Sequence, residues 1–178
     1  MTYVPASPGL GYAPIASTNA AITSMYVGGR KPGPELGDII RAVDPVYGAG
    51  EFIFLLGVAS TVVGSLVTWS GGLGAPTFQT ALAPSTANLA QPVAVAMSIN
   101  LAGFYGWYQI SGNAVIATNG TLATGPAPVY LAGSGQITST AAAGKQVVNA
   151  QNVSATGTPS TGLAVVFIDR PFAQGAIT

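Results

Sequence analysis

Short apolar runs alternate with turn-forming residues along most of the chain, and few of these runs are long enough for a helix. The runs are rich in valine, isoleucine and aromatic residues, and clusters of glycine, proline and asparagine bound them, which is typical of β-strands. Strands are expected within 37–44, 51–58, 64–69, 92–99, 104–110, 114–125, 128–140, 145–157 and 162–172. This pattern predicts an all-β fold, a single small β-barrel or β-sandwich.

Three local signals refine this prediction. The six residues 45–50 separate two strand-like runs, which predicts an antiparallel hairpin between 37–44 and 51–58. Asn119-Gly120 lies between two further β-rich runs and predicts a second, tighter hairpin. Residues 78–90 are the one stretch that resembles a helix, and a proline at position 84 limits it to a short one.

The uncharged stretch from Phe52 to Trp69 has the minimum length of a transmembrane helix. However, Gly57 and Gly64 interrupt it, serine and threonine side chains dilute it, and no basic residue flanks its C-terminal end. We therefore expect two buried strands with a turn between them, and no membrane span.

The N-terminal region differs from the rest, because prolines at positions 5, 8, 14, 32 and 34 exclude a helix. The sequence predicts an extended arm over 1–34, with a candidate short strand at 21–27, and a β-rich body over 35–178. The arm carries many apolar side chains for a solvated tail, so we expect it to lie on a neighbouring subunit or another protein. The expected contacts are its apolar anchors and the two basic residues at its exit: Tyr3, Tyr12, Ile15, Tyr26, Arg30 and Lys31.

Charged residues are scarce: five are basic and five acidic, or 6% of the 178 residues, against about 25% in an average soluble protein. Between Glu51 and Asp169 only Lys145 carries a charge. A neutral surface rich in alanine and hydroxyl groups promotes association, so we expect an oligomer or a part of a larger assembly. The lack of a basic excess argues against a nucleic-acid partner.

The chain contains neither cysteine nor histidine, which excludes disulfides, thiolate metal sites and the common Ser-His and Cys-His catalytic pairs. None of its Gly-x-Gly runs has the third glycine of a dinucleotide-binding loop, so we expect no cofactor. Asp44 and Glu51 flank the 45–50 turn and admit two interpretations. They form a carboxylate pair for hydrolysis or cation binding, or else Asp44 stabilises the turn while Glu51 pairs with Arg41; the second interpretation is favoured.

Two further groups of residues are candidates for contacts with a partner. Of the ten charged residues, seven lie between Arg30 and Glu51, either as an interaction face or as a solvated turn region. Tyr105, Trp107 and Tyr108 lie together on one predicted strand. Strand alternation divides such a group between core and interface, whereas a platform for sugar binding leaves it exposed.

Three runs, GDIIRAVDPVYGAGEFIFLLGVASTVVGSLVTW, PVAVAMSINLAGFYGWYQISGNAV and FIDRPFAQGAIT, resemble small virion proteins of tailed bacteriophages, of the capsid decoration or cement class. The resemblance covers about residues 37–116 and 162–178 and includes no catalytic motif. It implies a β-rich protein, commonly a homotrimer, on the outside of a capsid shell, where its partner is the major capsid protein.

From these observations we expect a non-enzymatic structural protein that cements a bacteriophage capsid by bridging shell subunits. Such a protein is made in the host cytoplasm and resides on the outer capsid surface, which fits an N-terminus without a secretory signal pattern. The alternative is a binding module at the base of a head or tail fibre, whose aromatic residues contact a host glycan. A small hydrolase that uses Asp44 and Glu51 is the third hypothesis.

Overall fold

In the computed structural model, which describes residues 4–5, 15, 34–70 and 78–176, the chain is all-β, and the described part contains no helix. The strands are β1 (Val4–Pro5), β2 (Ile39–Asp44), β3 (Gly48–Leu56), β4 (Leu66–Trp69), β5 (Thr80–Leu82), β6 (Val93–Ala96), β7 (Tyr105–Ala117), β8 (Pro128–Gly133), β9 (Gln136–Thr138), β10 (Gln146–Asn152) and β11 (Leu163–Ala173). The pairings between these strands are antiparallel. The all-β prediction is confirmed.

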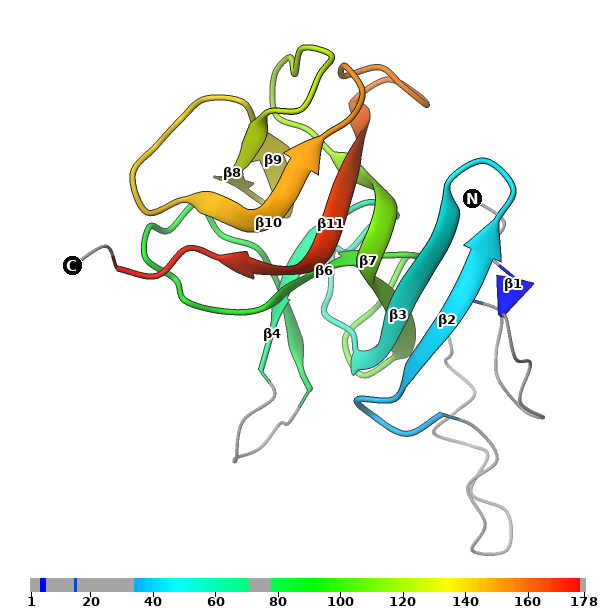
Figure 1. Cartoon of the computed structure of the whole chain (residues 1–178). Coiled ribbons are helices and arrows are strands. Elements are labelled where there is room, and N and C mark those ends of the chain that lie inside the picture. Colours follow the sequence, from blue (N-terminus) through cyan, green and yellow to red (C-terminus); the bar gives the residue numbers. More distant parts are fainter. Residues whose placement is uncertain (1–3, 6–14, 16–33, 71–77, 177–178) are drawn as a thin grey trace, which may run out of the picture.

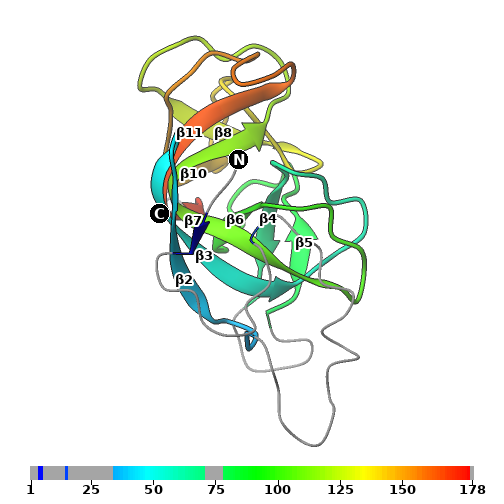
Figure 2. The same ribbon diagram turned by 90° about the vertical axis from the view of Figure 1, so that its right-hand side faces the viewer.

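The strands form one curled sheet with two branches that meet at β7. The longer branch has the order β1-β2-β3-β7-β11-β10-β8-β9, and Figure 1 shows it curving from β2 on one side to β8 and β9 on the other. The shorter branch continues from β7 through β6 and β4 to β5 (Figure 2). Leu66 N donates to Gly135 O at 2.7 Å and joins β4 to the turn between β8 and β9. The sheet therefore curls into a half-barrel whose two branches contact each other.

The branch point depends on where β7 changes partners. β11 pairs with residues 111–117 of β7, and it leaves β7 after Asp169, where Arg170 has a φ of 46°. β6 takes the vacated edge and pairs with Tyr108 and Gln109. On the opposite edge β3 follows β7 with a bulge beside Glu51. A bulge bends a strand and increases its twist, so this region directs the sheet along both branches.

Three groups of buried side chains hold the sheet together. The aliphatic cluster fills the curl between the two branches and consists of Leu66, Ala83, Val93, Val95, Ala114, Ile116, Leu122, Val129, Leu131, Ile137, Val147, Ala150, Ala164, Val166, Ile168 and Ala173. The aromatic cluster lies on β2, β3 and β7 and consists of Ile15, Ala42, Phe52, Phe54, Met97 and Trp107. The mixed cluster joins β3 and β7 to β4 and β6 and consists of Ile53, Leu55, Val67, Ala94, Ala96, Tyr108 and Ile110.

The first predicted hairpin is confirmed, with a shorter connection than the sequence indicates. β2 and β3 pair from Ile39↔Ile53 to Asp44↔Gly48, so three residues connect the strands. Asp44 Oδ1 accepts hydrogen bonds from the N–H groups of Val46 at 2.8 Å and Tyr47 at 3.0 Å. Asp44 therefore stabilises the turn, as the favoured interpretation of this carboxylate expects.

The apolar stretch 52–69 forms the end of β3, a turn and β4, as predicted. Val58 O accepts a hydrogen bond from Thr61 Oγ1, and Ser65 Oγ accepts one from Val62 N, so side chains bond to the backbone of the turn. Within the described part of the chain, the structure contains no helix with the length and apolar character needed to span a membrane.

The predicted hairpin at Asn119-Gly120 is wrong. Gly120 has the positive φ of a turn, but the next strand, β8, begins only at Pro128 and pairs with β9 and β10. The backbone N–H of Asn119 donates to Ile137 O at 2.8 Å, and Leu122 is buried in the aliphatic cluster. Long-range pairing at the end of β7 therefore overrides the local turn signal.

A tight hairpin forms instead inside 128–140, which the sequence indicates as one strand region. Ser134 and Gly135 have φ values of 52° and 72°, and Gly133 pairs with Gln136 across them. Two successive positive φ values match the turn type that suits the right-handed twist of a hairpin. A Cβ on Gly135 would lie 2.9 Å from Leu82 Cδ2 and 3.0 Å from Leu66 O, so glycine permits the close approach of β4.

The predicted short helix at 78–90 is also wrong. Residues 80–82 form β5, whose backbone groups pair with β4 from Trp69↔Thr80 to Val67↔Leu82. Beyond β5, Asn88 and Ala90 adopt positive φ values, which a right-handed helix does not contain. The proline at position 84 further excludes a continuous helical turn here.

Candidate interaction surface

A row of polar side chains crosses four adjacent strands on one face of the sheet. The register pairs Arg41 on β2 with Glu51 on β3, Glu51 with Ser111 on β7, and Ser111 with Asp169 on β11. Directly opposed residues of antiparallel strands share a face with Cβ atoms about 4.5–5.5 Å apart. These four residues and Arg170 are called the charged row below.

Glu51 is the central acceptor of the charged row. Its Oε2 accepts a hydrogen bond from Arg170 Nη2 at 2.8 Å, and its Oε1 lies 3.7 Å from Arg41 Nε. The two arginine side chains are 76% and 62% exposed, for Arg41 and Arg170 respectively, whereas that of Glu51 is 22% exposed. Exposed ion pairs contribute about 0–1 kcal/mol each, so the row adds little to the stability of the fold.

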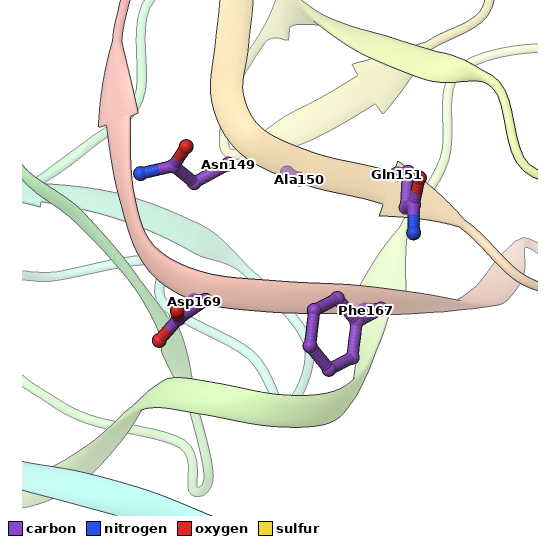
Figure 3. Close-up of a pocket in the computed structure, with 5 residues that line it drawn as sticks. All are labelled: Asn149, Ala150, Gln151, Phe167 and Asp169. Atoms are coloured by element: carbon purple, nitrogen blue, oxygen red, sulfur yellow. The ribbon is translucent and has the colours of Figure 1, made fainter.

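At one end the charged row adjoins a polar hollow of about 430 Å³ between β10 and β11. Figure 3 shows Asn149, Ala150 and Gln151 along β10, with Phe167 and Asp169 along β11. Asn149 adopts a φ of 59° at an irregularity in the β10–β11 register, a feature that redirects side chains at strand edges. Phe167 is 43% exposed, so this hollow offers an aromatic ring beside polar groups.

On its other side the charged row adjoins an apolar hollow of about 250 Å³ at the branch point of the sheet. Ile53 and Ile110 of the mixed cluster line it from β3 and β7, and Trp69 and Val93 line it from β4 and β6. Its remaining lining residues include Ile39, Arg170 and Phe172. Ile39 and Phe172 are 46% and 40% exposed, so solvent-accessible apolar groups border the hollow.

The structure places the predicted aromatic contacts mostly in the interior. Trp107 and Tyr108 are fully buried, in the aromatic and mixed clusters, and Tyr105 is half-buried and stacks on Phe54 at a centroid distance of 5.9 Å. The prediction of a partner contact is wrong for Trp107 and Tyr108, because successive side chains of a central strand are covered on both faces. β3 and β6 pair with the two edges of β7. Side chains of β3 belong to both clusters, and side chains of β6 belong to the mixed cluster.

Tyr108 belongs to a buried polar network. Its hydroxyl accepts a hydrogen bond from Asn100 Nδ2 at 2.8 Å, and Asn100 Oδ1 accepts one from Ser98 Oγ at 3.2 Å. Burial raises the pKa of the Tyr108 hydroxyl above 10.0, and hydrogen bonds with Thr80 and Asn100 oppose this shift. The network therefore fixes Ser98 and Asn100 of the loop after β6 in the interior, and its side chains offer no accessible group to a ligand.

Of the predicted arm contacts, the structure describes Ile15. This side chain is 1% exposed and packs in the aromatic cluster of its own chain, so an anchor on a neighbouring subunit is the wrong assignment for it. β1 of the arm also pairs with the same chain, with Val4 opposite Val43. The predicted contacts Tyr3, Tyr12, Tyr26, Arg30 and Lys31 and the candidate strand at 21–27 lie outside the described residues.

Asp44 and Glu51 do not form a carboxylate pair. Asp44 lies on the face of β2 that includes the buried Ala42, whereas Glu51 is opposite Arg41 on the other face. Asp44 is 3% exposed and accepts turn hydrogen bonds, and Glu51 binds two arginines. Among the described residues no group of three or more Asp, Glu, His or Cys is placed to hold a metal ion.

Sequence reasoning identified the Arg41–Glu51 pair but missed Asp169 and Arg170 as its neighbours. The Arg170–Glu51 contact spans 119 positions, and only the β3-β7-β11 pairing brings it together. The available signal was the isolation of this Asp-Arg pair in a region almost without charge. Both hollows were missed as well, because their lining residues come from distant strands.

A scan against protein-family models found no match, and a search of curated proteins found no relative of this chain.

Proposed function

We propose that this protein is a non-enzymatic structural protein of a bacteriophage virion, which binds the outside of the capsid and bridges shell subunits. The observation that supports this most is the charged row, which crosses β2, β3, β7 and β11 between two hollows. Four of the eight charged residues in the described part of the chain, Arg41, Glu51, Asp169 and Arg170, gather there. Such clustering on a neutral protein suits recognition of another protein.

The electrostatics of the charged row favour a role in binding another protein over a role in stabilising the fold. The ion pairs of the row are exposed and contribute about 0–1 kcal/mol each to folding. Charges of both signs at an interface set register and exclude wrong partners, whereas they change affinity less. A structural protein on a repeating shell needs this kind of register, since each copy binds an equivalent position.

Exposed apolar side chains on the same strands supply contact area. Ile39 is two residues from Arg41 on β2, and Phe167 is two residues from Asp169 on β11. Their exposed fractions are 46% and 43%. Apolar groups beside mixed charge are the composition expected of a protein–protein interface.

Binding to the assembled shell alone would stabilise that shell by mass action, and many copies would add small contributions. Self-association into a homotrimer is part of the proposal, and sedimentation velocity at micromolar concentration measures it. The alternative function requires an exposed aromatic platform for host glycans. Trp107 and Tyr108 are buried and provide no such surface. The carboxylates of the hydrolase hypothesis lie on opposite faces of the hairpin.

The test compares two charge reversals that change net charge equally. Arg41→Glu reverses a charge in the charged row. Lys145→Glu reverses the one charge that lies between Glu51 and Asp169 in the sequence. Each variant is titrated onto capsids that lack this chain, and bound protein is measured by co-sedimentation. We expect Arg41→Glu to weaken binding by about tenfold or more, because like charges across an interface are strongly unfavourable, and Lys145→Glu by less than about threefold.

The wild-type protein must also be present in purified particles at a fixed ratio to the major shell protein. Absence from the particles, together with failure to bind the stripped shell, would contradict the proposed function. Equal binding by both variants would place the contact elsewhere on the molecule.

A further inference from the structure

The apolar hollow at the branch point has the size of a site for one side chain. Its volume of about 250 Å³ is below the roughly 300–1,000 Å³ of pockets that enclose small-molecule ligands. Binding energy at protein interfaces concentrates in pockets of this kind, which an aromatic or aliphatic anchor of the partner fills. The size therefore favours an anchor side chain over a free metabolite.

One residue that lines the hollow carries a buried hydrogen-bond donor without an acceptor in the described part of the chain. Trp69, which stacks on Phe78 at a centroid distance of 6.1 Å, lines the hollow. Its Nε1–H is buried and finds no acceptor among the described residues. A buried polar group without a partner is costly, so an acceptor delivered by a binding partner recovers free energy. Rotamer changes of bordering side chains, which are common on association, bring such an acceptor to it.

Backbone strain at the border of the hollow is the third observation. Arg170 adopts a φ of 46° directly before Pro171, and both residues line the hollow. Helical backbone conformations are disfavoured for a residue before proline, and arginine rarely adopts a left-handed backbone conformation. The conformation of Arg170 therefore costs free energy. It directs β11 away from β7 and places the Arg170 guanidinium on Glu51. Strain that the rest of a fold maintains tends to occur at functional sites.

We propose that the apolar hollow receives an apolar side chain of a protein partner, with a backbone carbonyl of the partner accepting the Trp69 Nε1–H bond. Ile53, Ile110 and Val93 contact the inserted side chain, and Ile39 and Phe172 close over it. The charged row next to the hollow then sets the orientation of the partner. The identity of the partner as a capsid shell protein rests on the proposed function, whereas the chemistry of the hollow does not.

The first experiment blocks the hollow with a bulky exposed residue. Ile39→Trp places an indole at its border, and Val43→Trp is the matched control, because Val43 lies four residues further along β2 on the same face but does not line the hollow. Both positions are about half exposed and tryptophan is well tolerated in strands, so both variants are expected to fold. On stripped capsids, Ile39→Trp should bind about tenfold more weakly or worse, and Val43→Trp within about threefold of wild type.

The second experiment tests the hollow without any capsid. N-acetylphenylalaninamide is titrated into ¹⁵N-labelled protein, with N-acetylglycinamide as the probe that lacks the apolar side chain. The indole N–H resonance of Trp69, assigned through Trp69→Phe, should shift saturably with the first probe and stay unchanged with the second. The resonance of the fully buried Trp107 serves as an internal reference.

Each outcome decides the inference. Equal capsid binding by wild type and Ile39→Trp overturns it and leaves the proposed function standing. If the wild type does not bind capsids, the proposed function fails and the titration alone decides: a saturable Trp69 shift that Ile39→Trp abolishes supports the anchor site. No shift, or the same shift with the glycine probe, overturns it.

Discussion

The two halves of β7 belong to regions with different cores. After Gly112, Ala114 and Ile116 belong to the aliphatic cluster, which contains no aromatic side chain among its buried members. Residues before Gly112 contribute Trp107 to the aromatic cluster, together with Phe52 and Phe54 of β3. Small branched and alanine side chains fit the narrow interior of a curled sheet. The more open hairpin side needs large rings to cover its area.

The surfaces of the two regions differ in the same way. Apart from Lys145, the charged residues of the described chain lie on β2, β3, the segments flanking them and β11 near the branch point. Apart from Lys145, the curled region carries no charge, whereas the β2–β3 hairpin and the branch point carry the charged row and the apolar hollow. Under the proposed function, the second region presents the contact surface, whereas the first serves mainly the fold.

The largest expected effect comes from the junction between the two regions. Gly112 has a φ of 95°, and a Cβ there would overlap the backbone oxygen of Ala49 on β3. Because that contact is with backbone, Gly112→Ala should destabilise the fold by about 3 kcal/mol or more. Urea unfolding followed by circular dichroism measures the change.

Gly48→Ala is the matched control, since Gly48 has a φ of 79° and no atom within 4 Å of its added Cβ. It carries only the conformational cost, about 1–2 kcal/mol. Equal losses for the two variants would show that β3 and β7 separate easily and that the junction is not tightly packed.

A comparable effect distinguishes the two cores. Phe54 is 1% exposed and packs on Trp107 at a centroid distance of 5.0 Å, so Phe54→Ala should cost about 3–5 kcal/mol. Ile168→Val in the aliphatic cluster should cost about 0.5–1.5 kcal/mol. The urea unfolding midpoints of the two variants, at an unchanged slope, give the losses in unfolding free energy. A loss below about 1 kcal/mol for Phe54→Ala would mean that the aromatic cluster is loosely packed.

The smallest effect concerns alkaline pH. The pKa of Tyr108 is raised above 10.0 by burial, so the unfolded state releases this proton at lower pH than the folded state. The contribution to stability is therefore fully present below about pH 10 and declines as pH rises through the folded pKa. Tyr108→Phe should lower stability at pH 7 by about 1 kcal/mol, because Asn100 loses its acceptor, yet flatten the decline above pH 10.

Thermal unfolding from pH 7 to 11 measures both parts of this prediction. The half-buried Tyr105→Phe is the control. An identical alkaline decline in wild type and Tyr108→Phe would contradict the assigned cause.

Local patterns in the sequence determined most strand positions and the β2–β3 hairpin. Apolar runs bounded by glycine and proline predicted β3, β4, β6, β10 and β11, and Asp44 before a proline predicted the turn. The Arg41–Glu51 pair followed from the hairpin register. These features depend on residues close in sequence, whose propensities act without help from the rest of the chain.

The tertiary structure alone decided the partners of β7 and everything that follows from them. Residues 104–110 and 114–125 were predicted as separate runs, but the first run and the start of the second join into one 13-residue strand because β3, β6 and β11 bind its edges. The same pairings removed the Asn119-Gly120 hairpin, buried Trp107 and Tyr108, and brought Arg170 to Glu51 across 119 positions. Backbone hydrogen bonds between distant strands and burial of apolar area outweigh a two-residue turn preference, and no local pattern records which distant strands will meet.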